Sequence, residues 1–143
     1  MAPRHTNYVK KKNYNVIYDL SDPDPPKKHE RHAAKIVAEY FASDLIFIRK
    51  GFGTTPDLQI IKTNQIWELK SPLGIGKRSM DNNLREASNQ SKNIILDLTR
   101  CKMNNHKALS RIRSFLKSGD AHMKKLLVID KSGKILDYFI KKR

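Results

Sequence analysis

Three observations in the sequence predict an α/β domain in which helices flank a mixed central β-sheet. Segments with apolar residues at helical spacing alternate with short runs rich in Ile, Leu, Val and Phe, which is typical of alternating helices and strands. Two apolar runs flank Lys62–Gln65 and indicate an antiparallel hairpin. A helical segment separates this hairpin from the next apolar run, and such a crossover normally places the strands on either side of it parallel.

One folded domain is expected over residues 28–143, preceded by a basic arm and a proline-rich linker over residues 1–27. Within the arm, Tyr14–Tyr18 alternates enough for a marginal edge strand, and Asp22–Pro26 then breaks regular structure. The elements that lead to the hairpin are a helix (Lys28–Ser43), a short strand (Leu45–Ile48) and a loop (Gly51–Pro56).

The second half continues the alternation of helices and strands. Its expected elements are a loop (Ser71–Gly76), a helix (Asp81–Lys92), a buried strand (Asn93–Thr99), a helix (Asn104–Lys117, ended by Gly119) and a hairpin pairing Lys125–Asp130 with Lys134–Ile140. The order of elements therefore gives one sheet with helices on its faces.

The first hairpin, within Pro56–Pro72, places three ionisable side chains on one face. With a two-residue turn at Thr63-Asn64, Asp57 pairs with Lys70 and Gln59 pairs with Glu68. Cross-strand partners share a face, as do residues two apart on one strand. The ionisable face then holds Asp57, Glu68 and Lys70, and the apolar face holds Leu58, Ile60, Trp67 and Leu69. A one-residue slip in register would move Asp57 to the other face.

Two carboxylates and an ammonium on one face can perform phosphoester chemistry. Asp57 and Glu68 can hold a hard divalent cation through oxygen, and the cation can acidify a water molecule and neutralise a phosphate. Lys70 can orient that water or stabilise charge that develops on the scissile group. The alternative is a solvated sheet face with an incidental ion pair.

Glu30 is the third candidate carboxylate. It falls near the middle of the apolar face of the first predicted helix, whereas Glu39 points almost the opposite way. A carboxylate that faces the core is costly unless a metal or a cation compensates it. Alternatively, Glu30 lies in the first helical turn and interacts favourably with the helix dipole.

The composition points to a polyanionic partner. The chain has 29 basic and 14 acidic residues, a formal charge of +15, and residues 71–143 alone carry 17 basic against 6 acidic residues. This excess favours nucleic acid, an acidic membrane or an acidic protein. The single cysteine, Cys101, excludes an intramolecular disulfide and a cysteine-rich zinc site. No run is apolar enough to span a bilayer and no signal peptide is visible, so we expect a soluble chain without membrane insertion or an export signal of its own.

The candidate nucleic-acid-binding residues are Lys77, Arg78, Arg85, Gln90, Lys92 and Arg111. Lys77 and Arg78 follow Gly74 and Gly76, which could let the backbone approach a phosphate, although a mobile loop is the better interpretation of two spaced glycines. Gln90 could reach the site or a substrate phosphate, or could equally be a surface amide. Arg111 is expected on the exposed face of its helix.

Glu30 on a helix, Pro56-Asp57 and Glu68-Leu69-Lys70 together resemble the PD-(D/E)xK nuclease superfamily, whose fold is restriction-endonuclease-like. Two longer stretches, Trp67–Pro72 and Leu84–Leu98, are similar to the C-terminal tRNA nuclease domains of bacterial contact-dependent growth inhibition toxins. The similarity covers roughly Lys28 to the C-terminus.

The resemblance implies a metal-dependent endoribonuclease that acts on tRNA. Its metal ligands would be Glu30, Asp57 and Glu68, with Lys70 as a further catalytic residue. Magnesium or manganese suits these oxygen ligands, with zinc as an alternative. The resemblance also implies a cognate immunity protein, expected to be acidic, and action in the cytoplasm of a target bacterium after delivery by a secreted or cell-surface parent protein.

Two other functions stay open. A DNA endonuclease of the same superfamily would use the same residues, because RNA and DNA present the same phosphates. A non-catalytic, basic nucleic-acid-binding domain would use the acidic residues only to balance charge. Hydrolysis that disappears with EDTA separates an enzyme from a binding domain.

Overall fold

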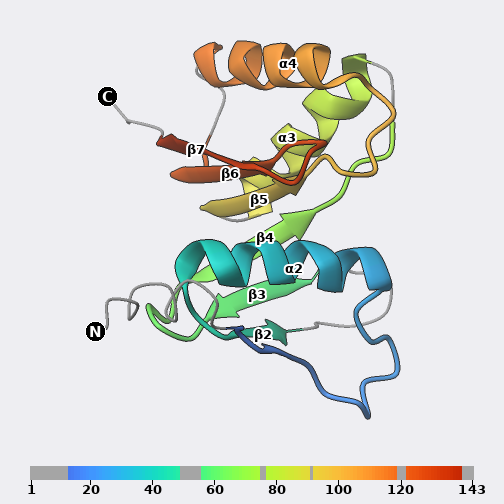
Figure 1. Ribbon diagram of the computed structural model, residues 1–143. Coiled ribbons are helices and arrows are strands. Elements are labelled where there is room, and N and C mark those ends of the chain that lie inside the picture. The colour runs from blue at the N-terminus through green and yellow to red at the C-terminus, as the bar shows by residue number, and fades with distance from the viewer. Residues whose placement is uncertain (1–12, 49–55, 75–76, 91, 119–121, 140–143) are drawn as a thin grey trace, which may run out of the picture.

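The computed structural model describes residues 13–48, 56–74, 77–90, 92–118 and 122–139. Its elements are β1 (Val16–Ile17), α2 (Lys28–Phe41), β2 (Leu45–Ile48), β3 (Asp57–Ile60), β4 (Ile66–Lys70), α3 (Lys77–Gln90), β5 (Asn93–Asp97), α4 (Asn105–Lys117), β6 (Lys125–Ile129) and β7 (Ile135–Phe139) (Figure 1). None of the helices within these ranges is long and apolar enough to cross a membrane.

The strands form one mixed sheet in the order β1-β2-β3-β4-β5-β6-β7, so spatial order follows chain order. β1 and β2, β4 and β5, and β5 and β6 pair in parallel. Each of these three pairs is joined by a helix, because a parallel connection must return along the length of the strands. The remaining neighbours, β2 and β3, β3 and β4, and β6 and β7, pair antiparallel. The predicted mixed sheet flanked by helices is confirmed.

α2 covers one face of the sheet through a cluster that we call the α2-side core. Its buried members are Ala33, Ala34, Val37, Ala38, Leu45, Phe47, Leu58, Ile60, Trp67, Leu69, Ile95, Leu127 and Ile129. The small residues of α2 let the helix approach the strands closely. The predicted apolar face of the first hairpin, which includes Trp67 and Leu69, lies within this cluster.

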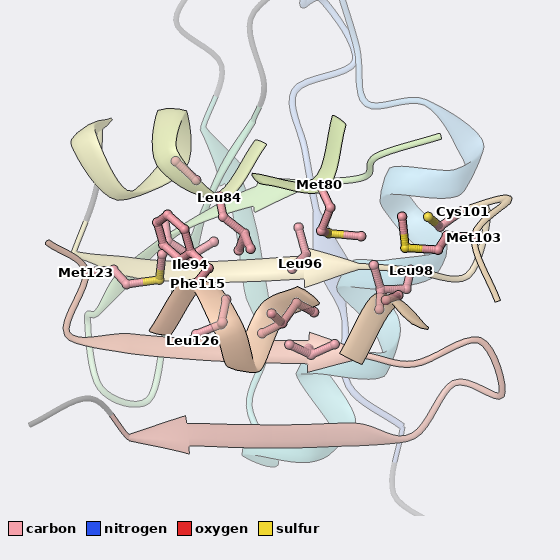
Figure 2. Packing of buried hydrophobic residues seen from close by; sticks show 14 residues of the cluster. Met80, Leu84, Ile94, Leu96, Leu98, Cys101, Met103, Phe115, Met123 and Leu126 are labelled. Atoms are coloured by element: carbon pink, nitrogen blue, oxygen red, sulfur yellow. The ribbon is translucent and has the colours of Figure 1, made fainter. Parts of the chain in front are cut away.

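α3 and α4 cover the opposite face through a second cluster, the α3-side core. It joins Leu84 and Ala87 of α3 to Ile112 and Phe115 of α4 across the strands. Ile94, Leu96, Leu126 and Val128 supply the strand residues. Figure 2 shows Cys101 and Met103 beside Leu98 at one end of this cluster and Met123 at the other. Because side chains alternate along a strand, Ile95 and Leu127 point to α2 while their neighbours point to α3.

The register of the first hairpin differs from the predicted one by two residues. Asp57 pairs with Glu68, not with Lys70, and Gln59 pairs with Ile66. The loop is longer than the predicted two residues: Ile60 N donates to Gln65 O at 2.9 Å, and Asn64 adopts a positive φ of 60°. A shift of two residues moves the pairs but keeps every side chain on its face, because the side-chain period of a strand is two.

Several predicted element ends are corrected by a few residues. α2 ends at Phe41 because Ala42 turns into the left-handed region at φ 52°, and α3 begins at Lys77 rather than at Asp81. β5 ends at Asp97, whose side chain accepts from the backbone of Thr99 and turns the chain. The predicted stop at Gly119, most of the predicted loop at 51–56 and part of the loop at 71–76 lie outside the described residues.

The second hairpin depends on Asp130. One carboxylate oxygen, Oδ1, accepts from Ser132 Oγ at 2.7 Å, from Ser132 N at 2.9 Å and from Lys134 N at 3.0 Å. Gly133 closes the turn with a φ of 89°, a conformation that glycine adopts at little cost. Burial would raise the pKa of Asp130, but these hydrogen bonds and the charge of Lys134 together hold that pKa below its ordinary value of 3.8.

Asp130→Asn is expected to lower the free energy of unfolding by about 1 kcal/mol at neutral pH, because a charged acceptor of three hydrogen bonds becomes a neutral one. A carboxyl whose pKa is lowered by folding stabilises the protein above its unfolded pKa and loses that contribution as pH falls through the folded pKa. The deficit should therefore shrink below about pH 4. Urea unfolding from pH 7 to pH 3 measures it, with the exposed Glu39→Gln as control. A deficit independent of pH would contradict this account.

Candidate active site

Asp57 and Glu68 face each other across β3 and β4, two interior strands of the sheet, near the end of β4. Asp57 is the first residue of β3, Glu68 is its cross-strand partner, and both side chains point to the α3 side because Leu58, Trp67 and Leu69 point to α2. Glu68 is 6% exposed and Asp57 is half-buried. The hairpin thus places two carboxylates of the predicted site at directly paired positions on neighbouring strands.

Lys70 lies beside Glu68 and is 6% exposed. Its Nζ is 3.5 Å from Glu68 Oε2 and donates to Glu86 Oε1 of α3 at 2.9 Å. A buried ammonium is costly unless charges of opposite sign surround it, and two carboxylates do so here. Lys70 is therefore fixed at one position between the hairpin and α3.

Glu86, which bonds to Lys70, was not among the site residues predicted from the sequence. Its side chain is 63% exposed, and its only signal was its place on the polar side of the predicted helix with Asn83 and Gln90. The packing of α3 against β4 decides which residue of that side meets Lys70. The helix therefore contributes a positioning carboxylate to the site.

Glu30 lies on the other face of the sheet, at the start of α2 and toward the end of β5. It lies in the first turn of α2, is 8% exposed, and its Oε1 accepts from Lys27 N at 2.8 Å. This bond satisfies one of the free backbone donors of the helix start, and a carboxylate there also suits the helix dipole. These contacts support the alternative interpretation, in which Glu30 is a first-turn residue of the helix. Lys70, by contrast, meets Glu86 on the opposite face of the sheet, the α3 side.

Asp97 is a further carboxylate that the sequence did not single out. It ends β5, is 1% exposed, and its Oδ1 accepts from Thr99 Oγ1 at 2.7 Å. Its Oδ2 is buried and has no hydrogen-bond partner among the residues that the structure describes. Burial lowers the pKa of His29, and the Arg100 charge lowers it further, while Glu30 and Asp97 act in the opposite direction. Asp97, at the end of β5, and Glu30, in the first turn of α2, therefore both lie within electrostatic range of His29.

The donor set fits one hard cation held by the hairpin. Within the described ranges, no three His, Cys, Asp or Glu side chains gather closely enough to form a ready metal site. Asp57 and Glu68 nevertheless supply two carboxylates from paired positions. Magnesium and similar ions commonly take one or two protein carboxylates and complete their shell with water and carbonyl oxygens.

The candidate nucleic-acid-binding residues divide into three groups. Arg85 and Lys92 are exposed, as a phosphate contact requires. Arg111 is not on an exposed face as predicted: it is half-buried, and its Nη2 is 2.9 Å from Asp81 Oδ2, so it links α4 to α3. The side chains of Lys77, Arg78 and Gln90 lie outside the described part of the chain.

Two comparisons with known proteins relate the chain to others. A family profile described as "Contact-dependent growth inhibition CdiA C-terminal domain" matches residues 54–135, which is more than half of the chain. The structure is similar to a chain of a CdiA-CT/CdiI toxin and immunity complex from Burkholderia pseudomallei, with a TM-score of 0.53 and 18% identity, over 87% of this chain and 98% of that one. No curated protein sequence gave a significant match. The matched residues span the hairpin, α3 and the strands that follow, and the chain belongs to the family of CdiA C-terminal domains of contact-dependent growth inhibition.

Proposed function

We propose that this domain is a toxin that hydrolyses phosphodiester bonds in tRNA with the help of a divalent metal ion, as a nuclease of the PD-(D/E)xK type. One observation carries the proposal: a buried lysine, Lys70, lies 3.5 Å from Glu68, and Glu68 faces Asp57 across a hairpin. Carboxylates and a lysine in this relation suit phosphoester cleavage.

Asp57 and Glu68 would hold the metal, which when bound supplies a more acidic water and neutralises phosphate charge. Lys70 would stabilise the negative charge that develops on the phosphate, or orient the attacking water, because its ammonium is fixed next to Glu68. Glu86 would keep Lys70 in that position from α3. Glu30 would reach the substrate or the metal from the start of α2, on the side of the sheet where β4 and β5 end.

The tRNA substrate rests on the resemblance of Trp67–Pro72 and Leu84–Leu98 to tRNA nuclease domains, and the basic second half of the chain agrees with it. Residues 71–143 carry 17 basic and 6 acidic residues, so this half would bind phosphates while the hairpin performs the chemistry. Arg85 and Lys92 are the exposed described residues that we assign to this contact, with Lys77, Arg78 and Gln90 beside them in sequence.

The partner would be an immunity protein with an acidic surface. The similar Burkholderia chain comes from a toxin and immunity complex, and a nuclease of this kind would harm the cell that makes it. A net charge of +15 favours an acidic protein that covers the path to Glu68 and Lys70. The domain would act in the cytoplasm of the target bacterium after delivery by a larger parent protein.

Incubating the purified chain with total tRNA, duplex DNA and a panel of divalent ions tests the activity. We expect cleavage of tRNA with magnesium or manganese, complete loss with EDTA, and recovery when metal is added back. If the chain cleaved DNA but not tRNA, the nuclease activity would stand and the proposed substrate would be wrong. If it bound nucleic acid but cleaved none with any metal ion, the proposed enzymatic activity would be wrong.

Expression of the chain without a companion gene tests the toxin. Bacteria that express the wild type should stop growing, while those that express Asp57→Ala should grow normally. Glu39→Gln, which changes an exposed charge of α2 outside the proposed site, serves as the control that should remain toxic. Equal growth of the wild type and Asp57→Ala would contradict the toxin function, even with the fold as described.

A further inference from the structure

Two rows of side chains cross the α3-side face of the sheet where β2, β3 and β4 lie next to one another. One row contains the candidate metal ligands, Asp57 on β3 and its cross-strand partner Glu68 on β4. The next row, which we call the Gln59 row, consists of Gln59 on β3 and its two cross-strand partners, Ile46 on β2 and Ile66 on β4. Asp57 and Gln59 are two residues apart on β3, so they share a face and lie about 7 Å apart along the strand. A molecule bound at Asp57 can therefore extend over the Gln59 row.

The Gln59 row lies outside both hydrophobic cores. None of its three residues is a member of the α2-side core or of the α3-side core. Ile66 is 46% exposed, and Ile46 and Gln59 are half-buried. The α3-side core takes its buried strand residues from β5 and β6, and Figure 1 shows α3 and α4 over that half of the sheet. The row is therefore partly open to solvent beside the candidate active site.

The side-chain amide of Gln59 can be reached by a ligand. Its nitrogen and oxygen form no hydrogen bond with any residue that the structure describes, and neither atom is fully buried. A primary amide presents two N–H donors next to a carbonyl acceptor. Ile46 and Ile66 place apolar surface on both sides of this amide. The row thus combines neighbouring donor and acceptor groups with two apolar flanks, and it carries no charge.

We propose that the Gln59 row binds the nucleobase next to the scissile phosphate, and that the Gln59 amide forms hydrogen bonds with the edge of that base. The inference rests on the proposed nuclease function, because a phosphate at the metal ligands Asp57 and Glu68 would place the adjoining nucleotide over this row. Unpaired RNA bases have an apolar face and an edge of donors and acceptors, and a glutamine amide can form two hydrogen bonds with such an edge.

The composition of the row favours a base over other parts of a ligand. A second phosphate would meet no cation in the row, because its three side chains are an amide and two aliphatic groups. An apolar peptide side chain would cover the Gln59 amide and leave it without a hydrogen-bond partner, which is costly. A ribose hydroxyl could bond to the amide, but it would not use the apolar surface of Ile46 and Ile66.

Nuclear magnetic resonance of the Gln59 side-chain amide tests the inference on the wild-type chain. The probes are the nucleoside monophosphates of the four RNA bases and ribose 5-phosphate, which has the sugar and the phosphate but no base, each titrated in the presence of magnesium. We expect at least one nucleotide to shift the Gln59 resonances saturably and to bind at least about tenfold more tightly than ribose 5-phosphate, because only a nucleotide has the base edge that the amide would contact. Equal affinity for all five probes, or no shift of the Gln59 resonances with any of them, would overturn the inference.

Gln59→Met provides the second arm, because methionine matches the length of glutamine and lacks the amide. This variant should lose most of the advantage of nucleotides over ribose 5-phosphate and bind ribose 5-phosphate as the wild type does. Gln65→Met, in the loop between β3 and β4 and outside the row, is the matched control and should keep the wild-type preference. Base-dependent binding without cleavage of RNA would support the row and contradict the nuclease function. Cleavage of RNA by a chain that binds all five probes equally would do the reverse.

Discussion

Lys70→Met should lower the rate of phosphodiester hydrolysis by about 10²- to 10³-fold, the usual effect of removing one group that stabilises charge in a transition state. Methionine keeps most of the volume of the side chain and removes the ammonium that lies between Glu68 and Glu86. Binding of substrate should change little, because one of 29 basic residues contributes little to the total attraction for phosphates. Single-turnover kinetics and fluorescence anisotropy with labelled tRNA measure the two quantities separately.

Lys102→Met is the matched control for Lys70→Met, because Lys102 is exposed and should leave the rate unchanged. The stability of Lys70→Met must be measured alongside, since removing one partner of a buried ion pair can cost about 3–5 kcal/mol. Glu86→Gln keeps an acceptor for Lys70 but removes the charge, so it should reduce kcat by about tenfold and leave KM unchanged. Cleavage by Lys70→Met at the wild-type rate would show that the hairpin is not the active site.

Asp57→Ala and Glu68→Gln should each weaken binding of a divalent ion by at least about 100-fold. Loss of groups that only support metal ligands already costs about 10- to 100-fold, so loss of a direct ligand should cost more. The paired positions of these two residues on β3 and β4 make them the carboxylates that we expect to share one ion directly. Isothermal titration calorimetry with magnesium and manganese measures the affinity, and Glu39→Gln, an exposed glutamate of α2, is the control.

Glu30→Gln distinguishes the two roles of Glu30. As a residue of the active site, it should show strongly reduced turnover, with a smaller loss of metal affinity than Asp57→Ala and an intact helix. The amide oxygen of the substituted side chain would still accept the hydrogen bond of Lys27 N, so the capping contact is preserved in this variant. If Glu30→Gln turned over substrate at the wild-type rate, Glu30 would have no role in catalysis and would act only at the start of α2.

The sequence by itself determined the elements of this protein and the faces of its strands. The spacing of apolar residues predicted three helices and the strands between them, and each of these helices and strands is present with ends that differ by at most four residues. Alternation along the first hairpin placed Asp57, Glu68 and Lys70 on the face opposite Trp67, which the structure confirms. These are local properties, because the helical and strand periods are set by the backbone of each segment.

Only the tertiary structure decided which side chains meet. The register of the hairpin depended on a loop longer than two residues, and the sequence pattern on the two strands allows any even shift. The contact of Glu86 with Lys70, and that of Arg111 with Asp81, join segments that are 16 and 30 residues apart in the chain. Neither pair can be predicted from the local sequence, because the sequence of a polar helix face is the same whether that face contacts solvent or another element. The packing of α3 on β4 and of α4 on α3 selected the partners, since burial of the apolar faces fixes the helix positions and the charged groups pair where they then lie.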